Sequence, residues 1–117
     1  QEREGFRLHP RPRPFRYAGA RDRAAMAAEN PRMGRAICRC ETVTEGEIVD
    51  AIHAPVPARS IDGVKRRVGS GMGRCQGGFC TPRVMEILSR ELGVPQTELT
   101  KNGGASRMLA GRTKEEA

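Results

Sequence analysis

The sequence predicts a small all-α domain, because its apolar residues recur at helical spacing behind recognisable helix-start signals. Three segments open with a capping residue and carry apolar side chains three and four positions apart. No segment shows the alternation of apolar and polar residues that is typical of a half-buried strand. With 117 residues, the chain has room for one domain and an appended arm.

The chain divides into three parts by composition. Residues 1–30 are expected to form a linker: an extended basic arm, with five Arg against two Glu in residues 1–17, and then an Ala-rich helix that ends before Pro31. Residues 31–106 hold the regular helical patterns and are predicted to form the domain. Residues 107–117 are predicted to be a flexible tail, and the glycine-rich stretch from Lys101 is expected to be frayed already.

The first helix of the domain is predicted over residues 44–54. Thr44 and Glu47 have the spacing of a capping box, in which the hydroxyl and the carboxylate each satisfy a free backbone N–H. Pro55 closes the segment. The capping role accounts for the presence of Glu47, and Glu45 is expected to be solvated. The two carboxylates are therefore not interpreted as catalytic acid and base. The expected apolar stripe consists of Ile48, Val49 and Ile52.

Two further helices and a short turn are expected after it. Residues 60–68 begin at Ser60 as the N-cap and end at Gly69. Residues 81–92 begin at Thr81 as the N-cap, with a proline at the first helical position, and end at Gly93. Residues 95–100 are expected to add one turn. The apolar stripes are Ile61, Val64 and Val68 in the first of these helices, and Val84, Ile87, Leu88 and Leu92 in the second.

Composition limits the core and the location of the chain. Apolar residues make up 37% and aromatic residues 3% of the chain, so the core is expected to be thin and to need a metal or disulfides. No run approaches the roughly 18 apolar residues of a membrane span, and the N-terminus lacks the apolar stretch of a secretory signal. A cytoplasmic location is therefore expected. The first residue is Gln rather than Met, which suggests a piece of a longer protein.

All four cysteines lie in two tight pairs, in "ICRCET" at 37–42 and "GMGRCQGGFC" at 71–80. A reducing cytosol favours metal ligation over disulfides, and Cys38 and Cys40 are too close in sequence for an unstrained disulfide. Thirty-four residues separate Cys40 from Cys75. Closing a loop of this length costs about 3 kcal/mol, whereas a structural metal contributes on the order of 10 kcal/mol. All four thiols can therefore converge on one centre.

The spacing favours a binuclear iron-sulfur cluster over zinc. Zinc sites with four cysteines use spacers of about two residues, whereas the spacers here are one and four residues. A 2Fe-2S cluster offers four terminal positions on two irons and tolerates unequal spacers. The second pair lies in a glycine-rich loop, where Gly77 and Gly78 are expected to let the backbone approach the cluster and aim N–H groups at sulfur.

Positive charge around the cysteines agrees with an anionic cluster. Arg39 and Arg74 are interleaved with the ligands and are expected to stabilise the reduced state, which raises the reduction potential. The basic run at residues 65–67 fits either this role or a solvated helix face. His53 is expected to be packed or solvated rather than a ligand. The methionines, Met85 among them, form no stripe and are expected to fill gaps.

Two other kinds of protein remain open on the residues alone. A zinc-stabilised nucleic-acid-binding module would suit the net charge of +7, although aromatic residues for base stacking are nearly absent. A thiol redox sensor is disfavoured because neither pair has the two-residue spacing of a thioredoxin-like motif. The segment "GSGMG" lacks the preceding strand and the longer glycine pattern of a dinucleotide-binding loop.

The segments "ICRCETVTEGEIVDAI", "IDGVKRRVGSGMGRCQGGFCTPRVMEIL" and "LTKNGGAS" together resemble a known family. They are similar to the 2Fe-2S domain related to bacterioferritin-associated ferredoxin, in the form found at the C-terminus of FAD-dependent dehydrogenases of the anaerobic glycerol-3-phosphate dehydrogenase type. The resemblance covers residues 30–106. The spacer of four residues before Cys80, where the stand-alone ferredoxin has two, favours the flavoprotein-associated branch.

The resemblance implies a helix-turn-helix-like fold of three to four short helices. It also implies that the cluster ligands are Cys38, Cys40, Cys75 and Cys80. The implied function is electron relay from a flavin-containing dehydrogenase domain or subunit, which holds the FAD, to a quinone or a redox protein. On this interpretation the chain has no catalytic residues of its own, binds no nucleic acid, and is cytoplasmic or held at the inner face of the membrane by its partners.

Overall fold

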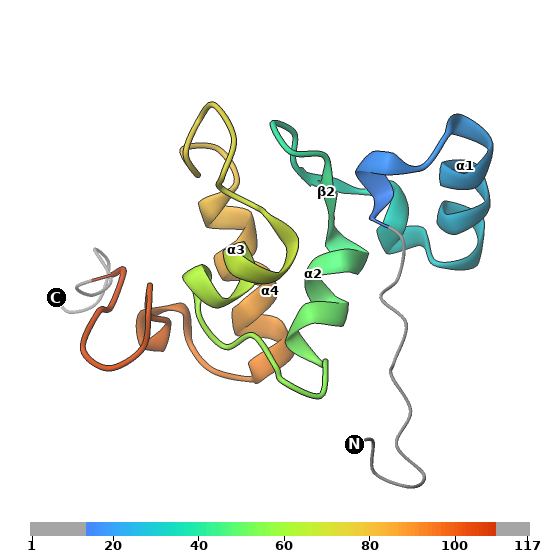
Figure 1. Ribbon diagram of the computed structural model, residues 1–117. Coiled ribbons are helices and arrows are strands. Elements are labelled where there is room, and N and C mark those ends of the chain that lie inside the picture. The colour runs from blue at the N-terminus through green and yellow to red at the C-terminus, as the bar shows by residue number, and fades with distance from the viewer. Residues whose placement is uncertain (1–13, 110–117) are drawn as a thin grey trace, which may run out of the picture.

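The computed structural model describes residues 14–109 of the chain (Figure 1). Most of the regular structure is helical. The α-helices are α1 (Ala20–Glu29), α2 (Glu45–Ile52), α3 (Ile61–Val68) and α4 (Thr81–Leu92). Three short 3-10 turns are η1 (Phe15–Tyr17), η2 (Pro31–Gly34) and η3 (Gln96–Glu98). The predicted helices and the short turn after α4 are thus present in the predicted order.

A small β-hairpin shows that the all-α prediction was not fully right. β1 (Ala36–Cys38) pairs antiparallel with β2 (Val43–Thr44), with an irregularity in the register. Strands of three and two residues are too short to show an alternating pattern in the sequence. The turn between them contains Thr42 with a positive φ of 53°, which tightens the connection. This hairpin carries the first cysteine pair.

α2 begins with the predicted capping box. The Glu47 backbone N–H donates to Thr44 Oγ1 at 3.2 Å, and the Thr44 backbone N–H donates to Glu47 Oε1 at 3.1 Å. Both groups are otherwise free at a helix N-terminus, so the pair stabilises the start of the helix. The helix ends at Ile52 with His53 as its C-cap, before the predicted stop at Pro55.

α3 follows its prediction closely. The Gly63 backbone N–H donates to Ser60 Oγ at 3.0 Å, which confirms Ser60 as the N-cap. Gly69 ends the helix in the left-handed region with φ 85°, which glycine adopts without a Cβ penalty.

α4 begins one residue earlier than predicted. Its N-cap is Cys80, and Thr81 is the first helical residue, with no side-chain capping bond at this end. The Thr81 backbone N–H donates instead to the Gly77 carbonyl at 3.1 Å, because the preceding loop already coils into the helix. Thr81 as an N-cap was therefore wrong, whereas Gly93 ends the helix in the left-handed region as predicted.

The core lies between α2, α3 and α4. Ile48, Val64 and Leu88 come from the three helices and are fully buried, as is Leu99 from the segment after η3. Each such side chain contributes about 1.5–3 kcal/mol relative to an exposed one. Met85 is also buried, which fits the expected use of methionine as a filler. The helices thereby form a compact support behind both cysteine loops (Figure 1).

The C-terminal side of the domain is more ordered than predicted up to Arg107. The Ile61 and Asp62 N–H groups donate to the carbonyls of Thr100 and Lys101 at 3.1 and 2.8 Å. Thr100 and Arg107 form an isolated antiparallel bridge. The expectation of fraying from Lys101 was therefore wrong, because this segment caps the N-terminal end of α3.

The two ends of the chain lie outside the described residues. Most of the predicted basic arm, residues 1–13, and most of the predicted flexible tail, residues 110–117, fall there. Within the part of the chain that the structure describes, no helix is both long and apolar enough to cross a membrane.

Candidate metal centre

Both cysteine pairs open into one cavity. The hairpin loop after β1 and the glycine-rich loop between α3 and α4 lie next to each other at one end of the molecule (Figure 1). The cavity between them has a volume of about 450 Å³. Its lining residues are Ala36, Ile37, Cys38, Arg39, Cys40, Cys75, Phe79, Cys80 and Arg83. The structure therefore brings together all four predicted thiols from segments that are far apart in the sequence.

The thiols lie as an inner and an outer pair, each with one member from each loop. Cys38 and Cys80 interact through their side chains and are only 1% and 3% exposed. Cys40 and Cys75 also share a side-chain hydrogen bond, and they are exposed and half-buried respectively. All four are free cysteines. The cavity thus has a buried end and an end open to solvent.

The backbone of the glycine loop favours a thiolate at Cys75. The backbone N–H of Phe79 lowers the pKa of the Cys75 thiol, followed by the hydrogen bond with Cys40, and the N–H groups of Gly77 and Gly78 act in the same direction. These donors oppose the effect of burial. Hydrogen bonds to the charged form stabilise it, so the predicted role of Gly77 and Gly78 in aiming N–H groups at sulfur fits this geometry.

Cys80 lies in the opposite environment. Burial raises the pKa of its thiol to about 11, and the neighbouring Cys38 adds to the increase. A buried thiolate without a cation is unfavourable. A metal centre bound here would supply the positive charge that allows this thiol to ionise.

The second loop requires glycine at two points where the chain packs closely. A Cβ atom added to Gly73 would collide with the Cβ atom of Cys40. Gly77 has φ +81°, and a Cβ atom there would lie 2.7 Å from Thr81 Oγ1. Gly73 therefore allows the two cysteine segments to pack directly against each other, whereas Gly77 allows the second loop to turn into α4.

The four cysteines match the number of terminal ligands of a centre with two metal atoms. Within residues 14–109, no group of three or more His, Cys, Asp or Glu side chains is placed to hold one metal ion. The four thiols instead form two neighbouring pairs along one cavity. Four cysteine ligands shared between two irons are the ligand set of a 2Fe-2S cluster. The residues present fit that group.

Arg39 and Arg83 line the cavity, and Arg74 is exposed beside Cys75. The cavity lining thus includes positive charge, and the role of Arg39 and Arg74 at the cluster stays a prediction. The basic run at residues 65–67 contributes nothing to the cavity lining. Arg66 bonds to Asn102, and Arg67 bonds to the carbonyls of Val56 and Gly63, so the alternative of a solvated helix face describes this run.

Three neighbouring residues were missed by the sequence reasoning. Arg16 Nη1 lies 2.9 Å from Glu41 Oε2, and Arg16 Nη2 donates to the Val68 carbonyl at 2.6 Å. Phe79 and Arg83 line the cavity although neither was singled out. Phe79 and Arg83 lie close to Cys80 in the sequence, and this proximity could have identified them as residues of the site. No pattern in the N-terminal arm identifies Arg16.

Two carboxylates that do not line the cavity have structural roles. Glu45 is only 6% exposed and pairs with Arg32, Arg35 and Arg90 at 3.3 to 3.5 Å. The prediction that Glu45 is solvated was therefore wrong. Glu91 pairs with the exposed His53 ring at 2.6 Å, so His53 is solvated, which is one of the two environments expected for it.

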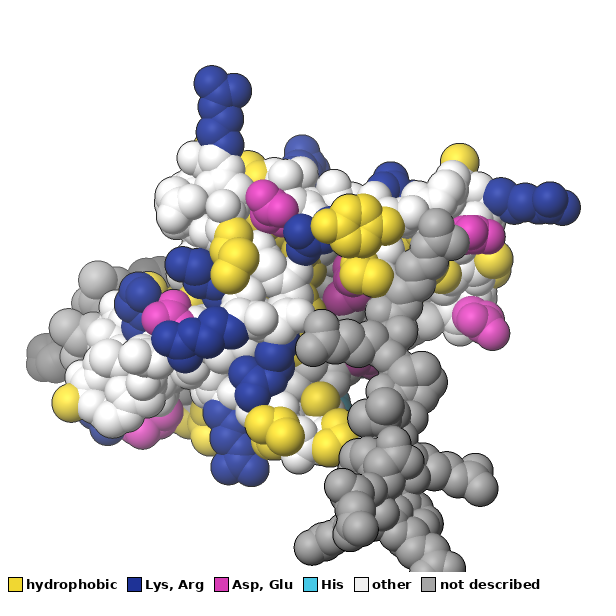
Figure 2. Space-filling view, viewed as in Figure 1, with side chains coloured by type: hydrophobic (Ala, Val, Ile, Leu, Met, Phe, Trp, Pro, Cys, Tyr) yellow, Lys and Arg dark blue, Asp and Glu magenta, His cyan; other side chains and the backbone are white. Residues whose placement is uncertain are grey.

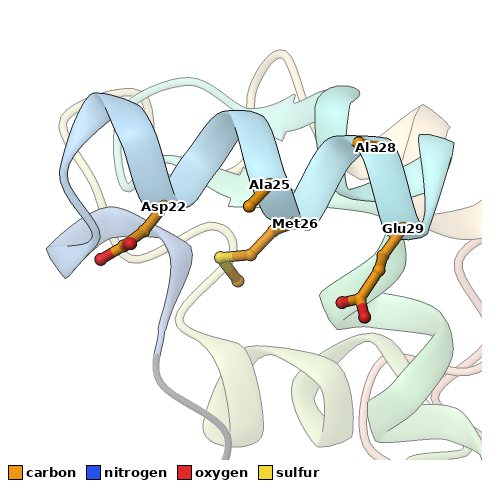
Figure 3. Close-up of a pocket in the computed structure, with 5 residues that line it drawn as sticks. All are labelled: Asp22, Ala25, Met26, Ala28 and Glu29. Atoms are coloured by element: carbon orange, nitrogen blue, oxygen red, sulfur yellow. The ribbon is translucent and has the colours of Figure 1, made fainter.

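A second depression lies along α1 and shares no residue with the cysteine cavity. It is shallow, and Asp22, Met26 and Glu29 lie along it with two alanines between them (Figure 3). No thiol or basic side chain contributes to it. It therefore has no part in the metal centre.

The fold and the thiol cavity define a small helical domain with a candidate metal centre lined by cysteines. Residues 36–90 match the BFD-like 2Fe-2S binding domain, and this part of the chain belongs to that family. The match confirms the resemblance and the expected 2Fe-2S cofactor. It begins and ends within the predicted domain of residues 31–106, whose bounds stay a prediction.

Several larger proteins contain a similar segment. The chain is 51% identical over 117 residues to a glycerol 3-phosphate dehydrogenase of Caloramator mitchellensis, covering 99% of this chain and 24% of that protein. It is 41% identical over 72 residues to the hydrogen cyanide synthase subunit HcnB of Pseudomonas aeruginosa, covering 58% and 15%. It is 32% identical over 81 residues to one subunit of the anaerobic glycerol-3-phosphate dehydrogenase of Haemophilus influenzae, covering 68% and 14%.

The chain thus spans about a quarter or less of the length of these relatives. No solved structure matches it.

Proposed function

We propose that this chain is the electron-transfer segment of a flavin-dependent dehydrogenase and relays electrons from the flavin through one 2Fe-2S cluster to an acceptor. The observation that carries the proposal is the convergence of four thiols from two distant loops on one cavity. When bound, the cluster supplies a site that stores and releases one electron at a time. The cluster ligands in this proposal are Cys38, Cys40, Cys75 and Cys80.

The residues around the thiols have distinct tasks in this proposal. The N–H groups of Phe79, Gly77 and Gly78 donate to the Cys75 sulfur and stabilise its charge. Arg39 and Arg74 offset the negative charge of a four-thiolate centre, which favours the reduced state. The buried end at Cys38 and Cys80 excludes water, whereas the end at Cys40 and Cys75 is accessible to a redox partner.

The names of two relatives support a proposal for the parent enzyme and its substrate. Two of them bear the name of glycerol 3-phosphate dehydrogenases, which favours a polyol phosphate as the substrate of the parent enzyme. FAD would lie in a flavin domain or subunit outside this chain, and the electron acceptor would be a quinone or a redox protein. The chain itself would hold no catalytic residue. We place the assembly in the cytoplasm or at the inner face of the membrane.

Metal and sulfide analysis tests this function directly. Protein purified without oxygen should contain two irons and two acid-labile sulfides per chain and show a visible band that dithionite bleaches. Reduction by a single electron should then give the electron paramagnetic resonance signal of a 2Fe-2S centre. A colourless protein with one zinc per chain, which binds nucleic acid, would support the nucleic-acid-binding module instead.

A further inference from the structure

The open end of the cysteine cavity exposes apolar side chains to solvent. Phe79 lies between Cys75 and Cys80 and is 86% exposed, and Met72 in the same loop is 49% exposed. Within the described residues, Phe79 is the most exposed of the large apolar side chains. Burial of an exposed aromatic side chain against a partner lowers the free energy of the complex. Its position at the rim of the cavity places that contact beside the outer thiol pair.

Arg39 and Arg83 line the cavity beside Phe79, and Arg74 precedes Cys75 in the glycine-rich loop. Arg39, Arg74 and Arg83 are exposed, and none of their side chains forms an ion pair or hydrogen bond with another residue of the described range 14–109. Figure 2 shows basic side chains projecting from this end of the molecule. Five other arginines of the described residues are paired with carboxylates, namely Arg16, Arg32, Arg35, Arg90 and Arg107.

The carboxylates near these arginines offset their charge only in part. Glu41 is held by Arg16 at 2.9 Å. Glu86 lies one turn along α4 from Arg83, and it has no partner in the described part of the chain. The three arginines therefore leave an excess of positive charge around Phe79. Complementary charge on a partner accelerates encounter and fixes orientation.

We propose that Met72, Phe79, Arg39, Arg74 and Arg83 form a docking face for an acidic redox protein, whose carboxylates surround an apolar centre. This inference rests on the proposed electron-transfer function and adds the chemistry of the partner. Phe79 supplies the central apolar contact, and the arginines orient the partner over the outer pair of thiols. One electron then passes from the reduced carrier to the oxidised one, and no bond is made or broken.

The test uses the full 117-residue chain with its cluster and an acidic flavodoxin as the probe protein. Arg83→Glu should weaken binding about tenfold at low ionic strength, and the difference should disappear at high salt. Phe79→Ala should weaken binding about tenfold at both salt concentrations, because apolar contacts are not screened. The dissociation constant and the rate of electron exchange are both measured.

Arg59→Glu is the matched control. Arg59 is exposed and without a partner in the described residues, and it precedes α3, whereas the glycine loop follows that helix. Both variants change the net charge equally. Equal losses for Arg59→Glu and Arg83→Glu would show a general charge effect and overturn the docking face. Failure of the wild-type chain to bind the flavodoxin would overturn it as well.

Two further results separate this proposal from its alternatives. A wild-type cluster that dithionite reduces, with no effect of Arg83→Glu on binding, overturns the docking face and leaves the electron-transfer function standing. A cluster that cannot be reduced overturns the function itself. Binding of phosphatidylglycerol vesicles that requires Arg83 and Phe79, without flavodoxin binding, would replace the protein partner with a membrane surface.

Discussion

Arg16 Nη1 lies 2.9 Å from Glu41 Oε2 and joins the arm to the loop that carries the first cysteine pair. The same guanidinium donates to the Val68 carbonyl at 2.6 Å, at the end of α3. Gly69 leaves room for this contact, because a Cβ atom there would lie 2.7 Å from Arg16 Nη2. One arginine from outside the family match at 36–90 thus connects both cysteine loops.

Arg16→Ala should therefore loosen the metal centre. The guanidinium is 25% exposed, and its two contacts are charge-assisted, so we expect a loss of about 1–2 kcal/mol in the free energy of unfolding. Iron should be released to a chelator several-fold faster. Arg21→Ala is the control, because Arg21 is exposed on α1 without a partner in the described residues. Equal chelation rates for the two variants would show that the arm has no role at the site.

Gly73→Ala should impair cluster assembly through packing alone. The added methyl group would meet the Cβ atom of Cys40, and Gly73 itself has no positive φ that alanine would strain. We expect the iron content of the purified protein to fall by more than half. Gly19→Ala is the matched control, because a Cβ atom at Gly19 meets nothing within 4 Å. Full iron content in Gly73→Ala would mean that the two loops separate more widely than in this structure.

The features that the sequence predicted correctly depend on residues close together in the chain. The capping box at Thr44 and Glu47 and the cap at Ser60 join residues only three positions apart, so their spacing was sufficient to place the helices. The start of α4 was missed by one residue because the glycine loop, rather than the Thr81 side chain, satisfies its first N–H groups. The hairpin was missed because its pairing involves too few residues to leave a pattern.

Contacts between distant segments could not be read in this way. Glu45 looked solvated beside Glu47, yet three arginines from two separate segments surround it. The order in residues 100–107 depends on backbone bonds to the start of α3, which no side-chain pattern reports. The proximity of the four cysteines could be predicted nevertheless. Binding to one metal centre requires the thiols to lie close together, whatever the path of the chain between them.

Cys75→Ser should remove the cluster and destabilise the domain. The hydroxyl group is a poor iron ligand in place of a thiolate, and the apolar core between the helices is small. We expect much of the helical signal from residues 37–99 to be lost, as measured by circular dichroism, together with the visible absorption. Met72→Ser in the same loop is the control and should keep both signals. Full helicity in Cys75→Ser would show that the core is stable without the metal centre.

Glu91→Gln should destabilise the domain in a pH-dependent way. The hydrogen bond from His53 and then that from Arg90 hold the pKa of the Glu91 carboxyl below its usual value. A lowered carboxyl pKa contributes stability above the unfolded-state pKa of about 4.3, and this contribution is lost as the pH falls below it. The His53 ring is 56% exposed, so solvent screening limits the contribution to about 0.5 kcal/mol. The difference in melting temperature between wild type and Glu91→Gln should therefore be present at pH 6 and shrink towards pH 4.

Glu86→Gln is the control on the same helix. Glu86 has no such partners in the described residues, so this variant should show no pH-dependent difference. If the difference in melting temperature for Glu91→Gln is the same at pH 6 and pH 4, Glu91 stabilises the domain through packing rather than through its charge.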